Sequence, residues 1–270
     1  MEVIITPNRD KAALLTARIV AKELKARPEA VLGLATGRTM EQVYAYLATF
    51  HQREGLDFSR CHTFNLDEYI GLSPGQEGTY RHYMEEHLFR KVNLRPGHTH
   101  LPDGAATDLA AECRSYEDRI RNLGGIDLQL LGIGTDGHIG FNEPLSALMS
   151  RTREKALTPA TLAQNAEMFG GDVSRVPRRA ITMGVGTILD CRRCLLLATG
   201  ASKAAILAQA VEGPITSMVT ASALQLHPRC QMVVDEDAAA QLKGQEYYRW
   251  ILANEPEWAE FRDLKALEPR

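Results

Sequence analysis

The sequence has no apolar run near the ~18 residues that a membrane-spanning helix requires, so we expect no membrane span. It also lacks a basic excess, because 31 Lys and Arg stand against 34 Asp and Glu and the net charge is −3. This balance disfavours nucleic acid as a partner, since such proteins usually carry a basic surface. Residues 1–7 are too few and too acidic for a secretory signal, which favours a cytoplasmic protein.

Cysteine is scarce and odd in number, which excludes a disulfide framework of the secreted type. The five residues are scattered: Cys61, Cys113, Cys191, Cys194 and Cys230. We expect reduced thiols, as in a cytoplasm. The last three include one C-x-x-C pair, but a zinc site usually has a second ligand pair and none is near in the sequence. The sequence therefore predicts free thiols and no metal.

Strand-like and helix-like segments alternate along the 270 residues, of which 44% are hydrophobic. The expected strands span residues 2–5, 31–35, 61–66, 126–133, 194–198 and 231–234. The expected helices span residues 11–25, 40–50, 80–92, 108–123, 202–212 and 237–253. This order predicts an α/β fold: a Rossmann-like, mainly parallel sheet with helices on both faces and right-handed crossovers. With no linker in sight, we expect residues 1–270 to form a single domain.

The residues from about 145 to 180 differ in composition from the rest of the chain. They are polar and carry only weak strand signals. One interpretation is a mobile lid over a site within the domain. The other is a long surface excursion without a role in binding, and the residues alone do not decide between the two.

Acid–base residues gather after the expected central strand. Asp136, His138 and Glu143 lie within eight residues, just beyond the apolar run at 126–133. Asp67 directly follows the expected strand 61–66, so Asp67 and His138 should meet at the carboxyl edge of the sheet. Open α/β sheets bind ligands at this edge, so we expect an acid–base site there. A lone acid at the end of a strand also serves commonly as a helix cap or lies in solvent.

The turn after the strand at 31–35 has the composition of an anion site. Gly37 lets the backbone approach an anion, Thr36 and Thr39 add hydroxyls, and Arg38 adds a positive charge. An ordinary turn with a threonine N-cap explains the same residues.

A second turn, at residues 199–203, has a similar form. Ser202 is a suitable N-cap, while Lys203 at the start of a helix opposes the helix dipole and indicates an anion nearby. Residues 132–137 match G-x-G-x-x-G, but the residues after them do not open a helix, so we expect no dinucleotide cofactor.

Six motifs, in this order along the chain, resemble the glucosamine-6-phosphate deaminase family. They are LATGxT (34–39), FNLDEY (64–69), GxGxDGHIGFNEP (132–144), SRTR (150–153), GVGTIL (184–189) and LQLHP (224–228). The third is highly specific. The resemblance covers about residues 1–250 and leaves out the segment after residue 253.

The resemblance implies one Rossmann-like domain that converts glucosamine 6-phosphate and water to fructose 6-phosphate and ammonia. By position, Asp67 resembles the base that moves a proton between C2 and C1, and His138 the group that opens the sugar ring. Asp136 and Glu143 resemble the acids that support His138. An imidazole suits ring opening because it gains and loses protons near neutrality. No metal or organic cofactor is implied.

The chain departs from this family at two charged positions. Arg38 stands where relatives have Gly or Ser, and Glu167 stands where relatives have a phosphate-binding Arg on the mobile segment. Either Arg38 supplies the lost positive charge, or the phosphate site is altered. An arginine in that turn can bind phosphate through two donors and can also pair with Glu167 when the segment closes.

Some members of the family are hexamers that N-acetylglucosamine 6-phosphate activates, and others are monomers. Ser146, Arg153 and Lys155 match parts of the effector site. Ala147 and Ala156 do not match its usual Ser and Thr. A homo-oligomer and an allosteric site are therefore hypotheses that the sequence leaves open.

Two rival functions remain. One is a related sugar-phosphate isomerase or lactonase of the same fold, which FNLDEY and FNEP disfavour. The other is a non-catalytic sugar-phosphate sensor, which the intact Asp67 and His138 disfavour, as does the absence of a DNA-binding head before the first strand. We expect a hydrolase-class enzyme of amino sugar metabolism that binds a small sugar phosphate.

Overall fold

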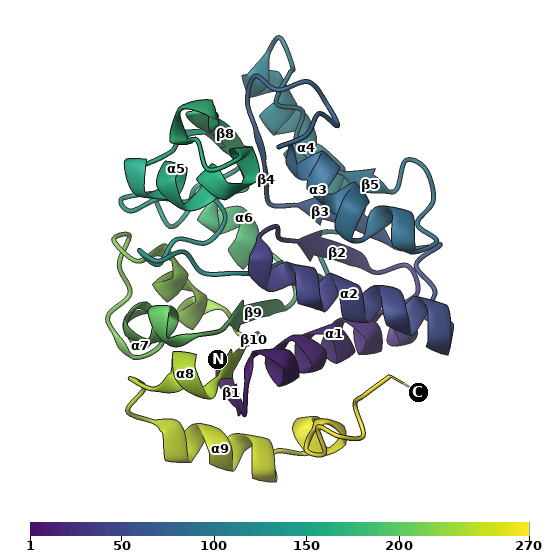
Figure 1. The fold of residues 1–270 in the computed structure, drawn as a ribbon, viewed down its shortest axis with the longest axis vertical. Coiled ribbons are helices and arrows are strands. Elements are labelled where there is room, and N and C mark those ends of the chain that lie inside the picture. Colours follow the sequence, from purple (N-terminus) through teal and green to yellow (C-terminus); the bar gives the residue numbers. More distant parts are fainter. Residues whose placement is uncertain (270) are drawn as a thin grey trace.

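A seven-stranded sheet forms the centre of the computed structural model, which describes residues 1–269 (Figure 1). Every neighbouring pair in this sheet is parallel. In spatial order its strands are β1 (Glu2–Thr6), β10 (Cys230–Asp235), β9 (Cys194–Ala198), β6 (Leu128–Leu131), β2 (Val31–Leu34), β3 (His62–Asn65) and β5 (Thr99–His100). The predicted α/β class and mainly parallel sheet are confirmed.

The central strands are buried along their whole length, as expected for a parallel sheet that helices cover. Gln129 is the polar exception on β6, and it is fully buried. Its amide donates to the Leu130 carbonyl at 2.9 Å. Gly33 on β2 makes room for it, because a Cβ there would lie 2.0 Å from Gln129 Oε1. One glycine thus lets a polar side chain pass between two neighbouring strands.

Two long helices, α1 (Arg9–Ala26) and α2 (Arg38–Glu54), lie side by side against the sheet (Figure 1). Asn8 caps α1 by accepting from the Lys11 amide at 3.0 Å. The other α-helices are α3 (Tyr80–His87), α4 (Leu109–Asn122), α5 (Pro159–Asn165), α6 (Val185–Leu189), α7 (Ala204–Glu212), α8 (Glu236–Ala239) and α9 (Gln245–Asn254).

A second sheet of three antiparallel strands was not predicted. Its strands are β4 (Asp67–Tyr69), β8 (Arg179–Thr182) and β7 (Arg153–Ala156), in that order. They are short, and β7 is polar and only partly buried, so none has the apolar alternation that predicts a strand. Segment 145–180 contains β7, α5 and the 3-10 helix η2 (Ala166–Phe169), so it has more regular structure than its weak strand signals predicted.

The predicted bounds of two helices are wrong. The single helix expected at 237–253 is two helices, α8 and α9. Glu212 explains the break, because its carboxylate accepts from the amides of Lys243 and Gly244 at 2.9 Å. The helix expected at 80–92 stops at His87 and continues as the 3-10 turn η1 (Phe89–Lys91).

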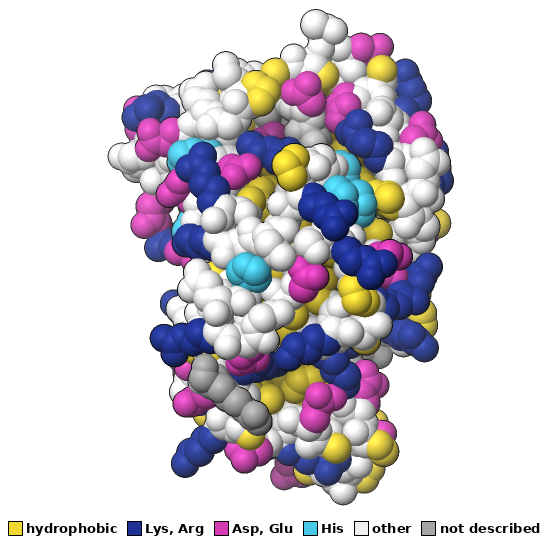
Figure 2. All heavy atoms as spheres, turned by 90° about the vertical axis from the view of Figure 1, so that its right-hand side faces the viewer, with side chains coloured by type: hydrophobic (Ala, Val, Ile, Leu, Met, Phe, Trp, Pro, Cys, Tyr) yellow, Lys and Arg dark blue, Asp and Glu magenta, His cyan; other side chains and the backbone are white. Residues whose placement is uncertain are grey.

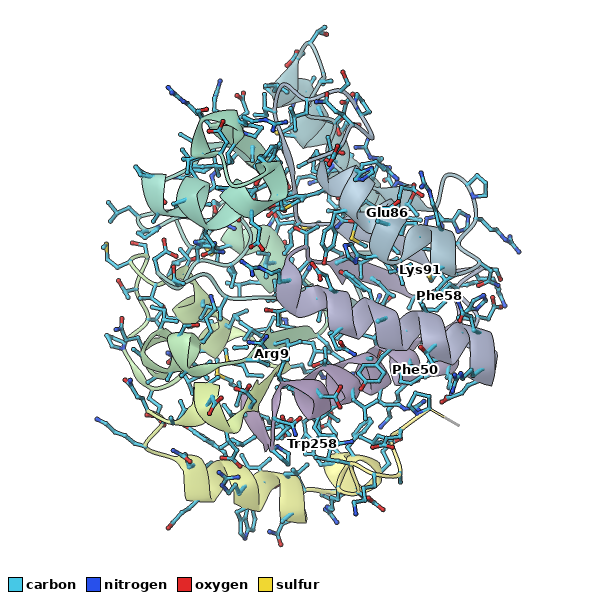
Figure 3. All side chains as sticks on the ribbon, viewed as in Figure 1. Arg9, Phe50, Phe58, Glu86, Lys91 and Trp258 are labelled. Atoms are coloured by element: carbon cyan, nitrogen blue, oxygen red, sulfur yellow. The ribbon has the colours of Figure 1, made fainter. Side chains whose placement is uncertain are left out.

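The segment after residue 253, for which the family resemblance gave no role, packs against α1. Trp258 and Phe261 on the 3-10 helix η6 (Pro256–Phe261) are buried, and Trp258 lies below α1 in Figure 3. Arg18 of α1 donates from Nε to the Leu267 carbonyl at 2.6 Å. Lys22 of α1 also lies over the Phe261 ring, with its Nζ 5.2 Å from the ring centre, so this segment is held against α1 by basic side chains of the helix.

Acidic and basic side chains are mixed on the face in Figure 2, without a large area of one sign. This agrees with the small net charge of −3. Within residues 1–269, no helix has the length and apolar character needed to cross a membrane.

A buried carboxylate joins α4 to the start of β7. Glu117 accepts from the Thr152 amide at 2.9 Å and from the hydroxyls of Thr152 and Thr187 at 2.6 and 2.5 Å. Arg151 donates to its other oxygen at 2.9 Å. Burial alone would raise the pKa of Glu117, but these hydrogen bonds and the Arg151 charge outweigh burial and lower it.

We predict that Glu117→Gln lowers the free energy of unfolding by about 1–3 kcal/mol at pH 7, the range for lost hydrogen bonds to a charged group. Since the folded-state pKa is lowered, the stabilisation is present above the unfolded pKa and is lost as the pH falls through the folded one. The difference between wild type and variant should therefore shrink below about pH 4. Urea unfolding at several pH values measures this difference.

The control is Asp118→Asn, on the same helix. Asp118 is exposed and pairs with Arg121, so its replacement should change stability by less than about 0.5 kcal/mol. Equal effects of the two substitutions would contradict the role given to Glu117.

Candidate active site

The four adjacent strands β9, β6, β2 and β3 end at one edge of the sheet, and a cavity of about 730 Å³ lies there. The turns after these strands line it. Seven of the residues predicted from the sequence are in its wall: Thr36, Gly37, Arg38, Thr39, Asp67, His138 and Lys203. The structure thus brings both predicted turns and two of the predicted acid–base residues to one space.

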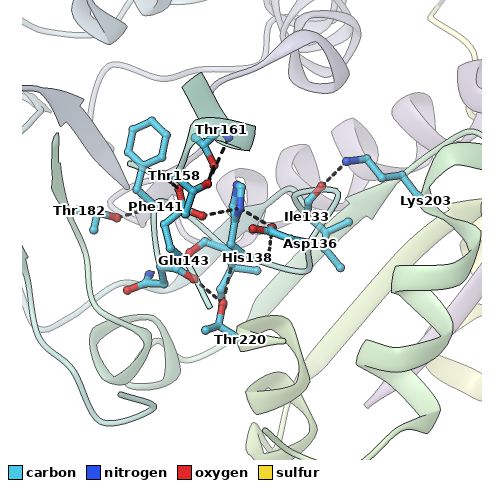
Figure 4. Close-up of polar contacts among 12 residues, drawn as sticks. Ile133, Asp136, His138, Phe141, Glu143, Thr158, Thr161, Thr182, Lys203 and Thr220 are labelled. Carbon is cyan, nitrogen blue, oxygen red and sulfur yellow. Dashed lines mark hydrogen bonds and ion pairs between the residues drawn. The ribbon is translucent and has the colours of Figure 1, made fainter. Parts of the chain in front are cut away.

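His138 stands between two carboxylates (Figure 4). Its Nδ1 lies 2.6 Å from Asp136 Oδ1 and 3.6 Å from Glu143 Oε2. Burial alone would raise the pKa of Asp136, but the hydrogen bond and charge of His138 outweigh it and lower the pKa to about 2. Asp136 is therefore ionised near neutrality and holds a proton on Nδ1. Nε2 is then the ring nitrogen left for a ligand.

Gly134 has no side chain, and this leaves the space that the His138 imidazole occupies. A Cβ at this position would lie 2.4 Å from His138 Cε1, well inside contact distance. The Gly134 amide also donates to the His138 carbonyl at 2.9 Å, which closes the loop on itself. Any larger residue at position 134 would displace the ring.

Asp136, His138 and Glu143 also offer one ligand atom each within 4.8 Å of one another, which is the spacing of a metal site. The contact of 2.6 Å between Nδ1 and Oδ1 is direct and leaves no space for an ion between these atoms. The arrangement fits an oriented imidazole better than a metal centre.

Asp67 is buried at the first residue of β4, opposite Thr182 on β8. Burial, with the neighbouring Glu68 charge, raises the pKa of Asp67 well above its usual value. Gly140 comes close to it, because a Cβ there would lie 3.4 Å from Asp67 Oδ2 and 3.0 Å from Thr182 Oγ1. Gly140 has φ +57°, which a side chain would strain further. The loop that carries His138 therefore reaches Asp67 through a glycine.

The adjacent acid, Glu68, has a different task. It accepts from the amides of Tyr69, Tyr80 and Arg81 at 2.8–2.9 Å. Two of these amides belong to the first turn of α3, so Glu68 supports the start of this helix together with its N-cap, Thr79. Of the two neighbouring acids in FNLDEY, Asp67 lines the cavity and Glu68 supports a helix.

The first turn presents an uncapped helix start. Gly37 is the N-cap of α2, with φ 113°, and no side chain caps the helix. The threonine N-cap that explained this turn without a ligand is absent at α2. Free amides at a helix start attract anions.

The second turn is similar, although the predicted N-cap is wrong. Gly200, with φ 89°, precedes the 3-10 helix η4 (Ala201–Lys203), and Ser202 caps neither η4 nor α7. Lys203 donates from Nζ to the Ile133 carbonyl at 2.7 Å (Figure 4). Burial lowers the pKa of Lys203, while the Asp136 charge opposes this shift. A cation is thus held in the wall of the cavity.

Two further charged residues, Arg9 and Glu167, line this cavity. Arg9 is the first residue of α1 and is labelled in Figure 3. Its Nη2 would lie 3.4 Å from a Cβ at Gly200. Sequence reasoning missed Arg9, although its place just after β1 was a usable signal. Arg38 forms an ion pair with Glu167, and both side chains are mostly exposed. The pairing considered for these swapped charges is therefore present in the structure.

The three candidate effector residues lie outside the cavity wall. Arg153 and Lys155 are on β7, and Ser146 is buried in the loop after Glu143. Arg153 donates to Asn142 Oδ1 at 2.9 Å, and burial lowers the pKa of Arg153. These contacts place Arg153 directly behind the His138 loop, while its part in effector binding remains a prediction.

Comparisons with known proteins agree on one family. A model described as glucosamine-6-phosphate isomerases/6-phosphogluconolactonase matches residues 9–233. A glucosamine-6-phosphate deaminase of Arthrobacter sp. (strain FB24) is 48% identical over 258 residues, which cover 96% of this chain and 99% of the relative. One from Hahella chejuensis (strain KCTC 2396) is 49% identical over 251 residues, 93% of this chain and 95% of the relative.

Solved structures show the same relationship. A monomeric glucosamine-6-phosphate deaminase superposes with a TM-score of 0.87 at 43% identity, covering 89% of this chain and all of that one. The 6-phosphogluconolactonase from Trypanosoma cruzi has a TM-score of 0.71 at 18% identity over 90% of this chain and 97% of that one, which shows the fold alone. The cavity and sheet define an α/β enzyme with its site at the carboxyl edge. The chain belongs to the glucosamine-6-phosphate isomerase/6-phosphogluconolactonase family.

We predict that Asp67→Asn stabilises the protein at pH 7 whatever it does to activity. Because burial raises the folded-state pKa of Asp67, the wild type loses stability as the pH rises from about 3.9, the unfolded value, through the folded one. The amide removes this loss. Thermal unfolding between pH 4 and 8 should show a higher Tm for Asp67→Asn, with a gap that widens as the pH rises.

Asp136→Asn is the matched variant, and its change in Tm should have the opposite sign. The folded-state pKa of Asp136 is lowered to about 2, so its charge stabilises the fold above about pH 4 and this variant should lower the Tm at pH 7. Shifts of the same sign in both variants would contradict the assigned environments.

Proposed function

We propose that the chain is a glucosamine-6-phosphate deaminase, which converts glucosamine 6-phosphate and water to fructose 6-phosphate and ammonia. One observation carries the proposal: a buried carboxyl and an oriented imidazole face the same cavity as two glycine turns that suit an anion. The deaminases that the chain resembles, at 48–49% identity, support the choice of substrate. The reaction cleaves a C–N bond with water, which places it among hydrolases.

Ring opening is the first step. His138 takes the proton of the C1 hydroxyl on Nε2 and returns it to the ring oxygen as the C1–O5 bond breaks. Asp136 and Glu143 hold the proton on Nδ1 and stabilise the imidazolium that forms between the two transfers. The product is the open-chain aldehyde, whose C2 proton is acidic.

Asp67 acts in the second step. Its carboxylate takes the C2 proton, giving an enolamine, and returns it to C1, giving an imine at C2. Water adds to C2, the C–N bond breaks, and ammonia leaves as the ketone of fructose 6-phosphate forms. A raised pKa suits a base that must also give the proton back, because proton transfer is best when donor and acceptor are matched.

The rival functions fit less well. The lactonase structures match at 18–19% identity and support a shared fold. Hydrolysis of a lactone does not require a base such as Asp67 at C2. A sensor that only binds has no use for an imidazole held by two acids.

The test is ammonia release from glucosamine 6-phosphate by the purified protein in the presence of a metal chelator. Equal amounts of ammonia and fructose 6-phosphate are expected. Neither product at saturating substrate would overturn the proposal, and hydrolysis of 6-phosphogluconolactone in its place would favour the lactonase.

We predict that His138→Gln slows turnover of the cyclic sugar by about 10²–10⁴-fold, the usual loss for a general acid–base. Turnover of an open-chain analogue that needs no ring opening should change far less. Asp67→Asn should abolish exchange of the C2 proton with solvent in both substrates. Equal loss on both substrates in His138→Gln would contradict the ring-opening role.

We also propose that the segment at about 145–180 covers the cavity and moves with substrate. It carries Glu167, whose partner Arg38 lies on the first glycine turn, so the ion pair spans the cavity mouth. Phosphate bound at this turn gives Arg38 a second anion and links closure to occupancy.

We predict that Arg38→Gly raises KM by about three- to ten-fold, because Glu167 is then unbalanced near the phosphate. Arg38→Gly with Glu167→Arg should restore KM by returning a cation to the segment. A double-mutant cycle on KM and kcat/KM measures the coupling. Additive effects, or an unchanged KM in Arg38→Gly, would exclude the compensation.

Two further proposals rest on the relatives and on composition. The chain is either a monomer, like the solved deaminase, or a homo-oligomer. If Ser146, Arg153 and Lys155 bind N-acetylglucosamine 6-phosphate, this sugar phosphate is its effector. The five free cysteines support a reducing compartment such as the cytoplasm.

A further inference from the structure

A cluster of two thiols and an imidazole lies at the edge of the sheet opposite the cavity. Cys194 is the first residue of β9, Cys191 stands three residues before it, and His227 precedes β10. The two Sγ atoms are 3.2 Å apart, and Cys191 Sγ lies 3.8 Å from His227 Nε2. All three side chains are buried. The sequence predicted ordinary free thiols here, because the fold alone brings the histidine to them.

Main-chain groups fix the proton on His227. The Arg229 amide donates to Nδ1 at 3.0 Å, so Nδ1 carries no proton. The proton is therefore on Nε2, which lies 2.8 Å from the Cys191 carbonyl oxygen and faces the Cys191 thiol. A metal ion would need the lone pair of this nitrogen. His227 is thus a donor beside the thiols and a poor ligand, although the spacing resembles that of a metal site.

The two thiols are unequal. The hydrogen bond to Cys194 lowers the pKa of Cys191, and burial acts against this shift. His227 lowers the pKa further, to about 6. The pKa of Cys194 is raised by the same contact and by burial. Each remaining cysteine has a raised pKa, mainly through burial: about 12 for Cys61, 11 for Cys113 and 12 for Cys230. The thiolate is the reactive form of cysteine, so Cys191 is the nucleophile of this set.

We propose that Cys191 and Cys194 are a peroxide-reactive dithiol that closes to a reversible intramolecular disulfide. The Cys191 thiolate attacks one oxygen of hydrogen peroxide and the O–O bond breaks. Cys191 sulfenic acid and hydroxide form, and this hydroxide takes the proton that Cys191 released on ionising, which gives the first water. Cys194 sulfur then attacks the Cys191 sulfur, the S–O bond breaks, and the departing hydroxide takes the Cys194 proton. Two thiols and one peroxide give one disulfide and two waters, and a small dithiol restores the thiols.

The geometry favours this closure over further oxidation. The sulfur atoms need to approach from 3.2 Å to a bond of about 2.05 Å. The thiol at position 194 already lies against the sulfur that becomes the sulfenic acid. Burial restricts the reagent to one as small as hydrogen peroxide.

The test exploits the sequence Cys191-Arg192-Arg193-Cys194, because trypsin cuts between the two cysteines. Reduced protein is treated with equimolar hydrogen peroxide at pH 7, denatured, alkylated and digested without reductant. Residues 180–192 should stay joined to residues 194–203, and dithiothreitol should separate them. Three of the five cysteines should be alkylated in place of all five.

Three variants sharpen the assignment. Cys194→Ser should stop the reaction at a sulfenic acid on Cys191, which dimedone traps. His227→Asn should slow disulfide formation several-fold. Cys113→Ser, the matched control outside the cluster, should leave the joined peptides unchanged.

Five alkylated cysteines after peroxide, or a bond that includes Cys61, Cys113 or Cys230, would overturn the proposal. So would a Zn²⁺ ion that the reduced wild type retains through desalting and Cys191→Ser does not, since the cluster would then be a metal site. Peptide mapping of the wild type decides the question even if a variant fails to fold.

Discussion

The parallel pairing of β9, β6, β2 and β3 is the constraint on which the site depends. Parallel strands all end at the same edge, so four turns that are far apart in the sequence meet there. β2 and β9 lead into the two glycine turns, β3 leads to Asp67, and β6 leads to His138. The register between these strands sets the separations within the cavity. The close passage of Gln129 beside Gly33 shows how little freedom that register has.

Two carboxyls of the candidate site, Asp67 and Asp136, have pKa values shifted in opposite directions. Asp67 is buried beside another acid and its ionised form is disfavoured, while the charge of Asp136 is stabilised by His138. One carboxyl is thereby suited to exchanging a proton and the other to remaining charged. Such a division of two acids by their surroundings is common in acid–base sites. Glu68 completes the pattern, because three amides occupy it and keep it away from the chemistry.

The sequence predicted the parts of the fold that depend on apolar patterns. Strands such as β9 are continuous apolar runs and were found, and their order implied the edge where Asp67 and His138 meet. The small antiparallel sheet was missed because β4 has three residues and β7 is polar. The break before α9 depends on Glu212, which is more than thirty positions away in the chain. Contacts of this kind leave no periodic signal.

The same limit applies to individual site residues. Motif and position identified the residues of the two turns and the acid–base group, since each comes after a strand. Arg9 carries no motif, and its approach to Gly200 depends on how α1 lies over the sheet. His227 reaches the thiol pair because β10 lies beside β9 in space and not because of any spacing along the chain.

The ion pair between Arg38 and Glu167 gives the cavity mouth its own counter-ion. Both side chains are exposed, so water and salt reach the pair and weaken it. Arg38 therefore has a carboxylate beside it even where no other anion is bound. Under the proposed closure, any anion that reaches Arg38, dissolved phosphate or sulfate included, would share this cation with Glu167 and compete with a sugar phosphate for it.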